Sequence, residues 1–244
     1  MSHLRHPPTM DERKAKATAW ALTFADMVTL LLTFFVLLLV ILNDAEKHID
    51  SAINKLLDAT YEEMNQDLSS DNVSVERVTK GIKITIRGNL FKSASSEMDP
   101  KYYPVIHQIG KIIRASGVIN IFEDEKHTNL LAMINESGSQ LNVEVRCEGH
   151  TDDEKLPPNA NYPSNWELSA ARSLNLVRLI NKYTAMPEKY FSAMGYGEFR
   201  PIIDVNSISN HAEKNKARAI NRRVEIYLDA FLKQKVQAEI EINI

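Results

Sequence analysis

The sequence predicts an α+β protein with a single N-terminal transmembrane helix, a short helical linker and an outer domain with helices on a mixed sheet. Three observations predict this architecture. An apolar run near the N-terminus is about 23 residues long, enough to cross a bilayer as a helix. Apolar residues then recur at helical spacing, and further on strand-like and helical patterns alternate. The expected boundaries are 1–18 for a cytoplasmic tail, 19–43 for the membrane helix, 44–72 for the linker, 73–235 for the outer domain and 236–244 for a C-terminal tail.

Composition excludes several classes of site. The 244 residues include 29 basic and 32 acidic side chains, a net charge of -3, which gives no support to a nucleic-acid-binding surface. Cys147 is the one cysteine, so neither an intrachain disulfide nor a cysteine-based zinc site can form, and only a dimer could pair it with itself. Because apolar and polar residues alternate over 143–147, we expect Cys147 to face inward from a strand as an inert core thiol.

The membrane segment extends from Trp20 to Leu42 and would span roughly 34 Å as a helix. A cleaved signal peptide normally has a shorter apolar region that ends in small residues, so this alternative fits poorly. Basic residues precede the segment and acidic ones follow it. The positive-inside rule therefore places the N-terminus in the cytoplasm and everything after residue 43 outside.

One charged residue, Asp26, interrupts the apolar run, at a cost of roughly 2.5–3.5 kcal/mol on insertion scales. At about 100° per residue, Thr23, Thr29 and Thr33 share its face of the helix. Two interpretations stay open: Asp26 carries a proton or sodium ion through the membrane, or it only holds two helices together while each threonine bonds a carbonyl one turn back.

This segment resembles a known family. The run Thr23-Phe24-Ala25-Asp26-Met27, followed by TLLLTFFVLL, is similar to the membrane helix of MotB and PomB, the smaller stator subunits of flagellar motors. The resemblance implies a homodimer inside a ring of a MotA-like or ZorA-like multi-pass partner, with five partner subunits around the dimer. It also implies that Asp26 is the ion-carrying residue, with transported H⁺ or Na⁺ and no bound cofactor.

The predicted linker has one apolar stripe, as an amphipathic helix would. Its members are Ile49, Ile53, Leu56, Tyr61, Met64 and Leu68. A dimer seam, a membrane-surface contact and an ordinary spacer helix all suit such a stripe, and resemblance to MotB adds a plug that blocks the channel before activation. Flagellar relatives usually have a longer linker, so this compact chain resembles ZorB of the Zorya anti-phage systems more closely.

The outer domain is predicted from its order of patterns. A strand pair covers 73–86 with a turn at Lys80-Gly81, a helix covers 102–115, and a strand at 141–147 leads to Gly149-His150-Thr151-Asp152-Asp153. A long helix starts near Asn165, another strand ends at 195–197, and the last strand starts at 221–226. The expected result is helices on one side of a mixed sheet.

Three ordered motifs in this region resemble the OmpA-like peptidoglycan-binding domain of OmpA, Pal and MotB. They are the Thr-Asp turn at 151–152, the helix start SNWELSAAR at 164–172 and the strand start NRRVE at 221–225. By that match Asp152 and Arg172 bind the peptidoglycan stem, one holding the amino group of diaminopimelate and the other its carboxylate. The secondary candidates are Thr151, Asn165, Leu168 and Arg223, which either line the pocket or shape it.

One stretch, 118–140, departs from that family pattern and has no predicted role. Its acidic residues and His127 are expected to form a solvated loop rather than a metal site. The same applies to the run 150–154, in which His150 is expected to be structural because the candidate ligands are too close in sequence for zinc. No metal site is predicted. The sequence also lacks a nucleophile motif or a phosphate-binding glycine loop, so we expect a protein that is not an enzyme.

Taken together, the residues and the resemblance predict an ion-conducting, peptidoglycan-anchoring subunit of a motor in the bacterial inner membrane. Three alternatives stay open: a flagellar MotB or PomB, a passive tether of the Pal type, and an energy transducer of the ExbD or TolR type. A Pal-type tether would not need Asp26, and an ExbD-type protein would lack the 151–225 motif series. The sequence does not determine whether the transported ion is a proton or sodium.

Overall fold

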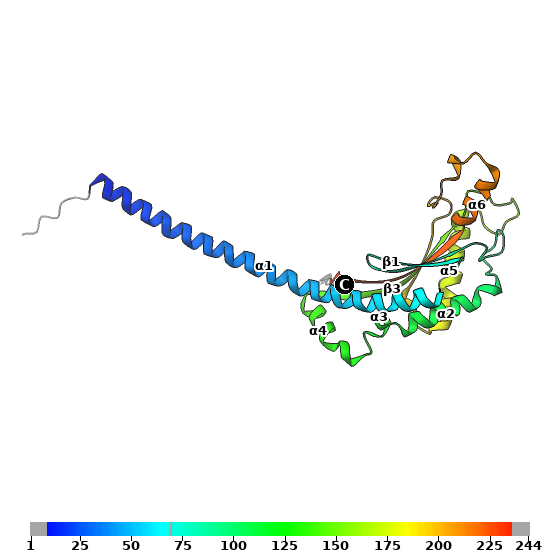
Figure 1. The fold of residues 1–244 in the computed structure, drawn as a ribbon, viewed down its shortest axis with the longest axis horizontal. Coiled ribbons are helices and arrows are strands. Elements are labelled where there is room, and N and C mark those ends of the chain that lie inside the picture. The colour runs from blue at the N-terminus through cyan, green and yellow to red at the C-terminus, as the bar shows by residue number, and fades with distance from the viewer. Residues whose placement is uncertain (1–8, 69, 236–244) are drawn as a thin grey trace, which may run out of the picture. The chain divides into compact units, whose positions relative to one another are not determined.

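The computed structural model of the protein describes residues 9–68 and 70–235 (Figure 1). The predicted tail 236–244 lies outside the described residues. The chain forms two compact units, one up to His48 and one from Ile49 onward. Helix α1, Met10–Leu68, contributes residues to both.

In the first unit, α1 contains a stretch, Thr18–Ile41, that is long and apolar enough to cross a membrane. The described residues contain one such helix, as predicted. Its leucine, valine and phenylalanine side chains are exposed. Exposed apolar side chains over such a length are what a helix surrounded by lipid would present.

The second unit begins with the end of α1, which the sequence analysis treats as a linker. One face of this helix is buried in the hydrophobic core of the unit, through Ile49, Ile53, Leu57, Met64 and Leu68. Leu56 and Tyr61, which the predicted stripe includes, are only partly buried against that core. The compact unit therefore starts at Ile49 instead of residue 73, because its core needs this helix face.

The sheet has five strands in the order β1-β2-β5-β3-β4. The strands are β1 (Val73–Val78), β2 (Gly81–Arg87), β3 (Ser139–His150), β4 (Phe191–Gly195) and β5 (Arg223–Gln234). β3 and β4 pair in parallel and the other neighbours pair antiparallel. The sheet is therefore mixed, as predicted, and β5, the last strand among the described residues, is its central strand.

Helices cover one face of this sheet (Figure 1). α2 (Tyr103–Ala115) packs against α5 (Asn165–Thr184), and α5 packs on β3 and β4. The alternating apolar residues of the strands point into this layer, among them Ile84, Ile226 and Cys147, which are fully buried. The inward-facing core thiol is thus confirmed, and burial raises the pKa of Cys147 far above its usual range.

The segment 118–140, for which the sequence offers no role, is mostly helical. Val118 of α3 (Gly117–Asn120), Ile121 directly after α3, and Ile134 of α4 (Thr128–Glu136) are buried in the core. The acidic residues between these helices are exposed, and Asp124 caps a 3₁₀ turn, Glu125–His127, by accepting from the Lys126 amide. This segment is therefore part of the fold, although its charged turn is solvated as expected.

Four further elements complete the fold. Three are 3₁₀ turns, at Pro100–Tyr102, Glu188–Tyr190 and Val205–Ser207. The fourth is α6 (His211–Asn221), a helix that the sequence analysis does not predict and that leads directly into β5. Asn221, at its end, fastens the preceding loop by bonding the backbone of Ile202 and Ile203.

Candidate functional site

The site begins where β3 ends. The Thr151 amide donates to the Gly197 carbonyl at 3.0 Å, which pins the end of β3 to the loop after β4. Asp152 follows and is buried, at 8% exposure. The Thr151 hydroxyl is also buried, and among the described residues it has no hydrogen-bond partner. A buried hydroxyl without a partner is costly, so this position favours a bound polar ligand or water.

The start of α5 is fastened to the same turn. The Ser164 hydroxyl caps the helix by accepting from the Trp166 amide at 3.1 Å. The Asn165 side chain donates to the carbonyls of Glu154, at 3.0 Å, and Asp152, at 3.4 Å. Asn165 therefore shapes the turn that presents Asp152.

Arg172 lies two turns further along α5 and is 8% exposed. Its Nε donates to the Ser95 carbonyl at 3.0 Å and its Nη2 to the Lys92 carbonyl at 3.3 Å, and the guanidinium lies over the Phe91 ring. Burial lowers the pKa of Arg172 to about 10, although the Asp152 carboxylate opposes this effect. The guanidinium is therefore positively charged at neutral pH.

The hydrogen bonds from Arg172 to the loop between β2 and α2 leave part of its guanidinium group available for a ligand. The two donors in use face the carbonyls of the loop between β2 and α2. Nη1 makes no hydrogen bond to any described residue. A carboxylate could therefore approach the end of the guanidinium, formed by Nη1 and the second hydrogen of Nη2.

Arg222 is a site residue that the motif match does not predict. Its Nη1 bonds Asp152 Oδ2 at 2.5 Å, whereas the predicted Arg223 turns to the opposite side, where it bonds Glu225 and the carbonyl of Arg200. Strand alternation could have separated the two arginines. Arg222 is in phase with Val224, whose side chain faces the helices, so Arg222 faces Asp152 and Arg223 cannot.

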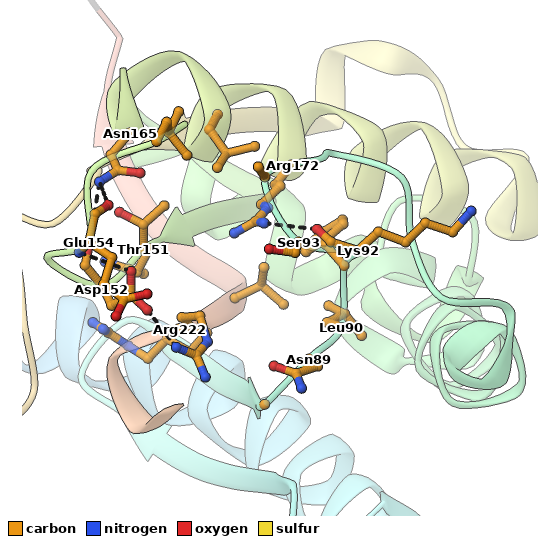
Figure 2. Close-up of a pocket in the computed structure, with 18 of the residues that line it drawn as sticks. Asn89, Leu90, Lys92, Ser93, Thr151, Asp152, Glu154, Asn165, Arg172 and Arg222 are labelled. Carbon is orange, nitrogen blue, oxygen red and sulfur yellow. Dashed lines mark hydrogen bonds and ion pairs between the residues drawn. The ribbon is translucent and has the colours of Figure 1, made fainter. Parts of the chain in front are cut away.

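These side chains surround a cavity of about 670 Å³ (Figure 2). Of the predicted site residues, Thr151, Asp152, Asn165, Leu168 and Arg172 all line it. Arg223 also contributes to its wall, but its guanidinium is engaged as described above. The basic lining residues are Lys92, Lys101, Lys155, Arg172, Arg222 and Arg223, against the acidic Asp99, Asp152 and Glu154. This excess of positive charge favours a ligand that carries carboxylates.

The membrane stripe lies in the other unit. Thr23, Asp26, Thr29 and Thr33 are all exposed on α1. Each threonine hydroxyl donates to a carbonyl one turn back, at 2.9 Å for Thr23 to Trp20, 2.8 Å for Thr29 to Asp26 and 2.9 Å for Thr33 to Leu30. The threonines therefore bond the backbone one turn back, as one of the two interpretations predicts. Asp26 is the one ionisable side chain of this stripe.

Two family models match this chain in separate regions. Residues 5–59 match the family described as membrane MotB of the proton-channel complex MotA/MotB, and residues 122–216 match the OmpA family. One chain therefore contains both a segment similar to the MotB model and a segment similar to the OmpA-family model. The MotB-type match includes Asp26, and the OmpA-family match includes Asp152 and Arg172.

Whole-length relatives agree with this division. The chain is 26% identical over 229 residues to the uncharacterized protein YtxE of Bacillus subtilis, covering 87% of this chain and 88% of YtxE. It is 24% identical over 247 residues to Motility protein B of the same organism, covering 86% and 90%. Because the alignment includes most of Motility protein B, compactness alone does not separate this chain from motility proteins. The likeness to ZorB stays a prediction.

Two solved structures share the fold. The cell wall anchor of the T6SS from Pseudomonas aeruginosa is 26% identical, with a TM-score of 0.50, and the match covers 72% of this chain and 97% of that one. A putative MotB-like protein from Desulfovibrio vulgaris is 20% identical, with a TM-score of 0.52, covering 78% and 98%. The predicted α+β, OmpA-like outer domain is therefore confirmed.

Proposed function

We propose that this chain is the ion-conducting, peptidoglycan-anchoring subunit of an ion-driven rotary motor in the bacterial inner membrane. The carrying observation is that one chain combines a MotB-type membrane helix containing Asp26 with an OmpA-family cavity formed around Asp152 and Arg172. A motor that produces torque needs both an ion pathway and a fixed point. Neither half alone would supply both.

The cavity suits the peptide stem of peptidoglycan. Diaminopimelate has an amino group for the Asp152 carboxylate and a carboxylate for the free end of the Arg172 fork. The Thr151 hydroxyl, which bonds none of the described residues, lies next to Asp152 and could bond the same ligand. The cell wall anchor of Pseudomonas aeruginosa, with a related sequence and fold, supports this role.

The membrane helix suits ion transfer. A carboxylate in lipid is costly unless it faces a partner or a pathway, and its oxygens can take up a proton or help to hold a sodium ion. We propose a homodimer whose helices sit inside a ring of five subunits of a MotA-like or ZorA-like protein. The N-terminus would be cytoplasmic and the unit from Ile49 onward periplasmic.

Peptidoglycan binding is tested by sedimentation of the purified full-length protein in detergent with isolated sacculi. Arg172→Ala removes the proposed carboxylate contact and should weaken binding about tenfold or more, since a charge-assisted pair contributes about 1.5–3 kcal/mol. The matched control is Arg178→Ala on the same helix, because Arg178 is exposed and, within the described part of the chain, bonds only Asn175. Equal binding by wild type and Arg172→Ala would refute the assignment of this site, provided that the variant stays folded by circular dichroism.

Ion transfer is tested by Asp26→Asn, which keeps nearly the same shape and hydrogen-bonding capacity but cannot exchange a proton or supply a negative charge. Recovery of the complex with its partner and peptidoglycan binding should be unchanged, whereas motor activity should be lost. If Asp26 only held helices together, the amide would preserve activity. A fully active Asp26→Asn complex would therefore exclude the ion-carrying role and show that Asp26 only holds helices together.

A further inference from the structure

The face of the sheet opposite the helices carries a buried row of ionisable side chains. Glu148 and His150 lie two residues apart on β3, and Glu225 lies directly opposite Glu148 on β5. Alternation along the strands therefore places all three on the same face. Their exposure is 4%, 3% and 7%, unusually low for charged and polar groups on the face without helices.

His150 is directed at both carboxylates without bonding either. Its Nε2 lies 3.9 Å from Glu148 Oε2 and 3.9 Å from Glu225 Oε1, beyond hydrogen-bond distance. Neither ring nitrogen has a hydrogen-bond partner among the described residues. A buried imidazole without partners is costly, so its environment is incomplete without a further group.

The three donor atoms have the spacing of a metal site. One nitrogen and two carboxylate oxygens lie within 4.8 Å of one another. An ion bonded to each at about 2.0–2.2 Å would hold them roughly 3.4 Å apart at tetrahedral angles. Small side-chain rotations would bring the three ligand atoms from their present spacing to that shorter one.

Outer partners already orient these ligands. Arg146 bonds Glu148 through Oε1, which leaves Oε2 directed at His150. Tyr227 donates to Glu225 Oε2 at 2.6 Å, and Arg223 bonds Oε1. The Tyr196 ring stacks on the imidazole, with centroids 5.3 Å apart. Hydrogen-bonded carboxylates and a fixed ring are typical of the second layer around a bound metal.

The charge of the neighbouring arginines is shared with other acceptors. Arg146 also pairs with Asp229 at 2.9 Å, and Arg223 also donates to the carbonyls of Arg200 and Asn221. Each arginine therefore divides its hydrogen bonds between one of the two glutamates and other acceptors. A divalent cation between Glu148 and Glu225 would be bound by two deprotonated carboxylates, the form that metal binding requires.

We propose that Glu148, His150 and Glu225 bind one divalent transition-metal ion of the zinc class, through His150 Nε2 and one oxygen from each glutamate, with water as the fourth ligand. An imidazole ligand distinguishes zinc-like ions from magnesium and calcium, which prefer all-oxygen sites. The ion clips β3 to β5 just before Thr151 and Asp152. It does not depend on peptidoglycan binding or on ion transfer at Asp26.

The first test uses tag-free, full-length protein in detergent, treated with EDTA and then freed of chelator. Zinc is titrated against a chromogenic competitor, with magnesium and calcium as comparison ions, and bound metal is counted by mass spectrometry. We expect one zinc ion per chain and a higher unfolding temperature with zinc than without. A wild-type protein that binds no zinc would overturn the proposal.

Variants then locate the ion. His150→Gln and Glu148→Gln should each weaken zinc binding at least about tenfold, whereas His211→Gln, at an exposed histidine on α6, should not change it. If His150→Gln fails to fold, Glu148→Gln decides, because it keeps the shape of the side chain. Unchanged zinc affinity in Glu148→Gln, or loss only in His211→Gln, would place the metal elsewhere and refute the site.

Discussion

At the residue scale, Arg222 determines how Asp152 is presented. Arg222→Gln removes the 2.5 Å ion pair and one positive charge from the cavity. Because the arginine is one-third exposed, we expect a modest effect of about 1 kcal/mol, or roughly fivefold weaker binding to sacculi. Sedimentation with isolated sacculi measures this directly.

The matched control for that experiment is Arg218→Gln. Arg218 bonds Asp153 and Glu154 but not Asp152. Arg218→Gln should therefore leave the affinity for sacculi close to that of the wild type. Tighter binding by Arg222→Gln would show instead that Arg222 competes with the ligand for Asp152.

Cys147 gives a second prediction at this scale. Its side chain is fully buried, and burial raises the pKa of the thiol, so the reactive thiolate is scarce at neutral and mildly alkaline pH. The native protein should react with a thiol reagent such as Ellman's reagent at least about a hundredfold more slowly than the protein unfolded in guanidinium. Rapid labelling, or a dimer linked through Cys147 in non-reducing gels, would contradict this.

Residues that line the cavity are identified from the sequence where they lie close together in short motifs. Asp152, Asn165 and Arg172 lie in two short motifs, and the structure brings all three to one cavity. The Glu148, His150 and Glu225 cluster could not be predicted in this way. It depends on the register of two strands whose sequences are separated by more than 70 residues, and register is set by the whole sheet.

At the element scale, α5 approaches the sheet so closely that only glycine fits beneath it. A Cβ at Gly149 would lie 2.3 Å from the Ser169 carbonyl oxygen. Gly149→Ala should therefore lower the free energy of unfolding by about 1–3 kcal/mol. It should also displace Arg172 on α5, and this displacement should weaken binding to sacculi. Thermal unfolding and sedimentation test the two effects.

Gly117→Ala is the comparison for that variant. A Cβ there would meet only the flexible end of the Leu56 side chain, at 3.0 Å. Its unfolding temperature should stay near that of the wild type. Equal stability of Gly149→Ala and the wild type would mean that α5 is not held at this distance.

The end of α1 leads to a prediction about domain boundaries. A fragment starting at residue 73, the boundary predicted from sequence, would lose five buried apolar side chains of α1 from its core. At about 1.5–3 kcal/mol for each, this loss is comparable to the whole stability of a domain. We expect fragment 49–244 to unfold cooperatively and fragment 73–244 to be unfolded or to aggregate, as measured by circular dichroism during heating.

Cooperative unfolding of both fragments at the same temperature would show that the helix is a separate linker after all. The sequence predicts the amphipathic character of this helix correctly, because periodicity is a local property. It does not identify what covers the stripe. A dimer seam, a membrane surface and the protein's own core present the same apolar chemistry, so the partner of an apolar face is determined only by the tertiary fold.

At the scale of the whole molecule, the proposed motor function predicts a phenotype. If the chain serves in defence, as the predicted likeness to ZorB implies, deletion of its gene should leave swimming unchanged and increase phage sensitivity. Complementation with the wild type, but not with Asp26→Asn, should restore protection. A deletion strain that stops swimming with unaltered phage sensitivity would assign the chain to a flagellar motor instead.

The strand order has a consequence for how the domain is made. β5 is synthesised last, yet it lies between the β1-β2 hairpin and the β3-β4 pair. Until residues 223–234 emerge, the two halves of the sheet have no strand to join them, and the contacts that link β2 to β5 are distant along the chain. The unit from Ile49 onward should therefore stay unfolded through nearly all of its synthesis and fold only after β5 has been made. An unfolded chain is the form that the proposed export across the inner membrane needs.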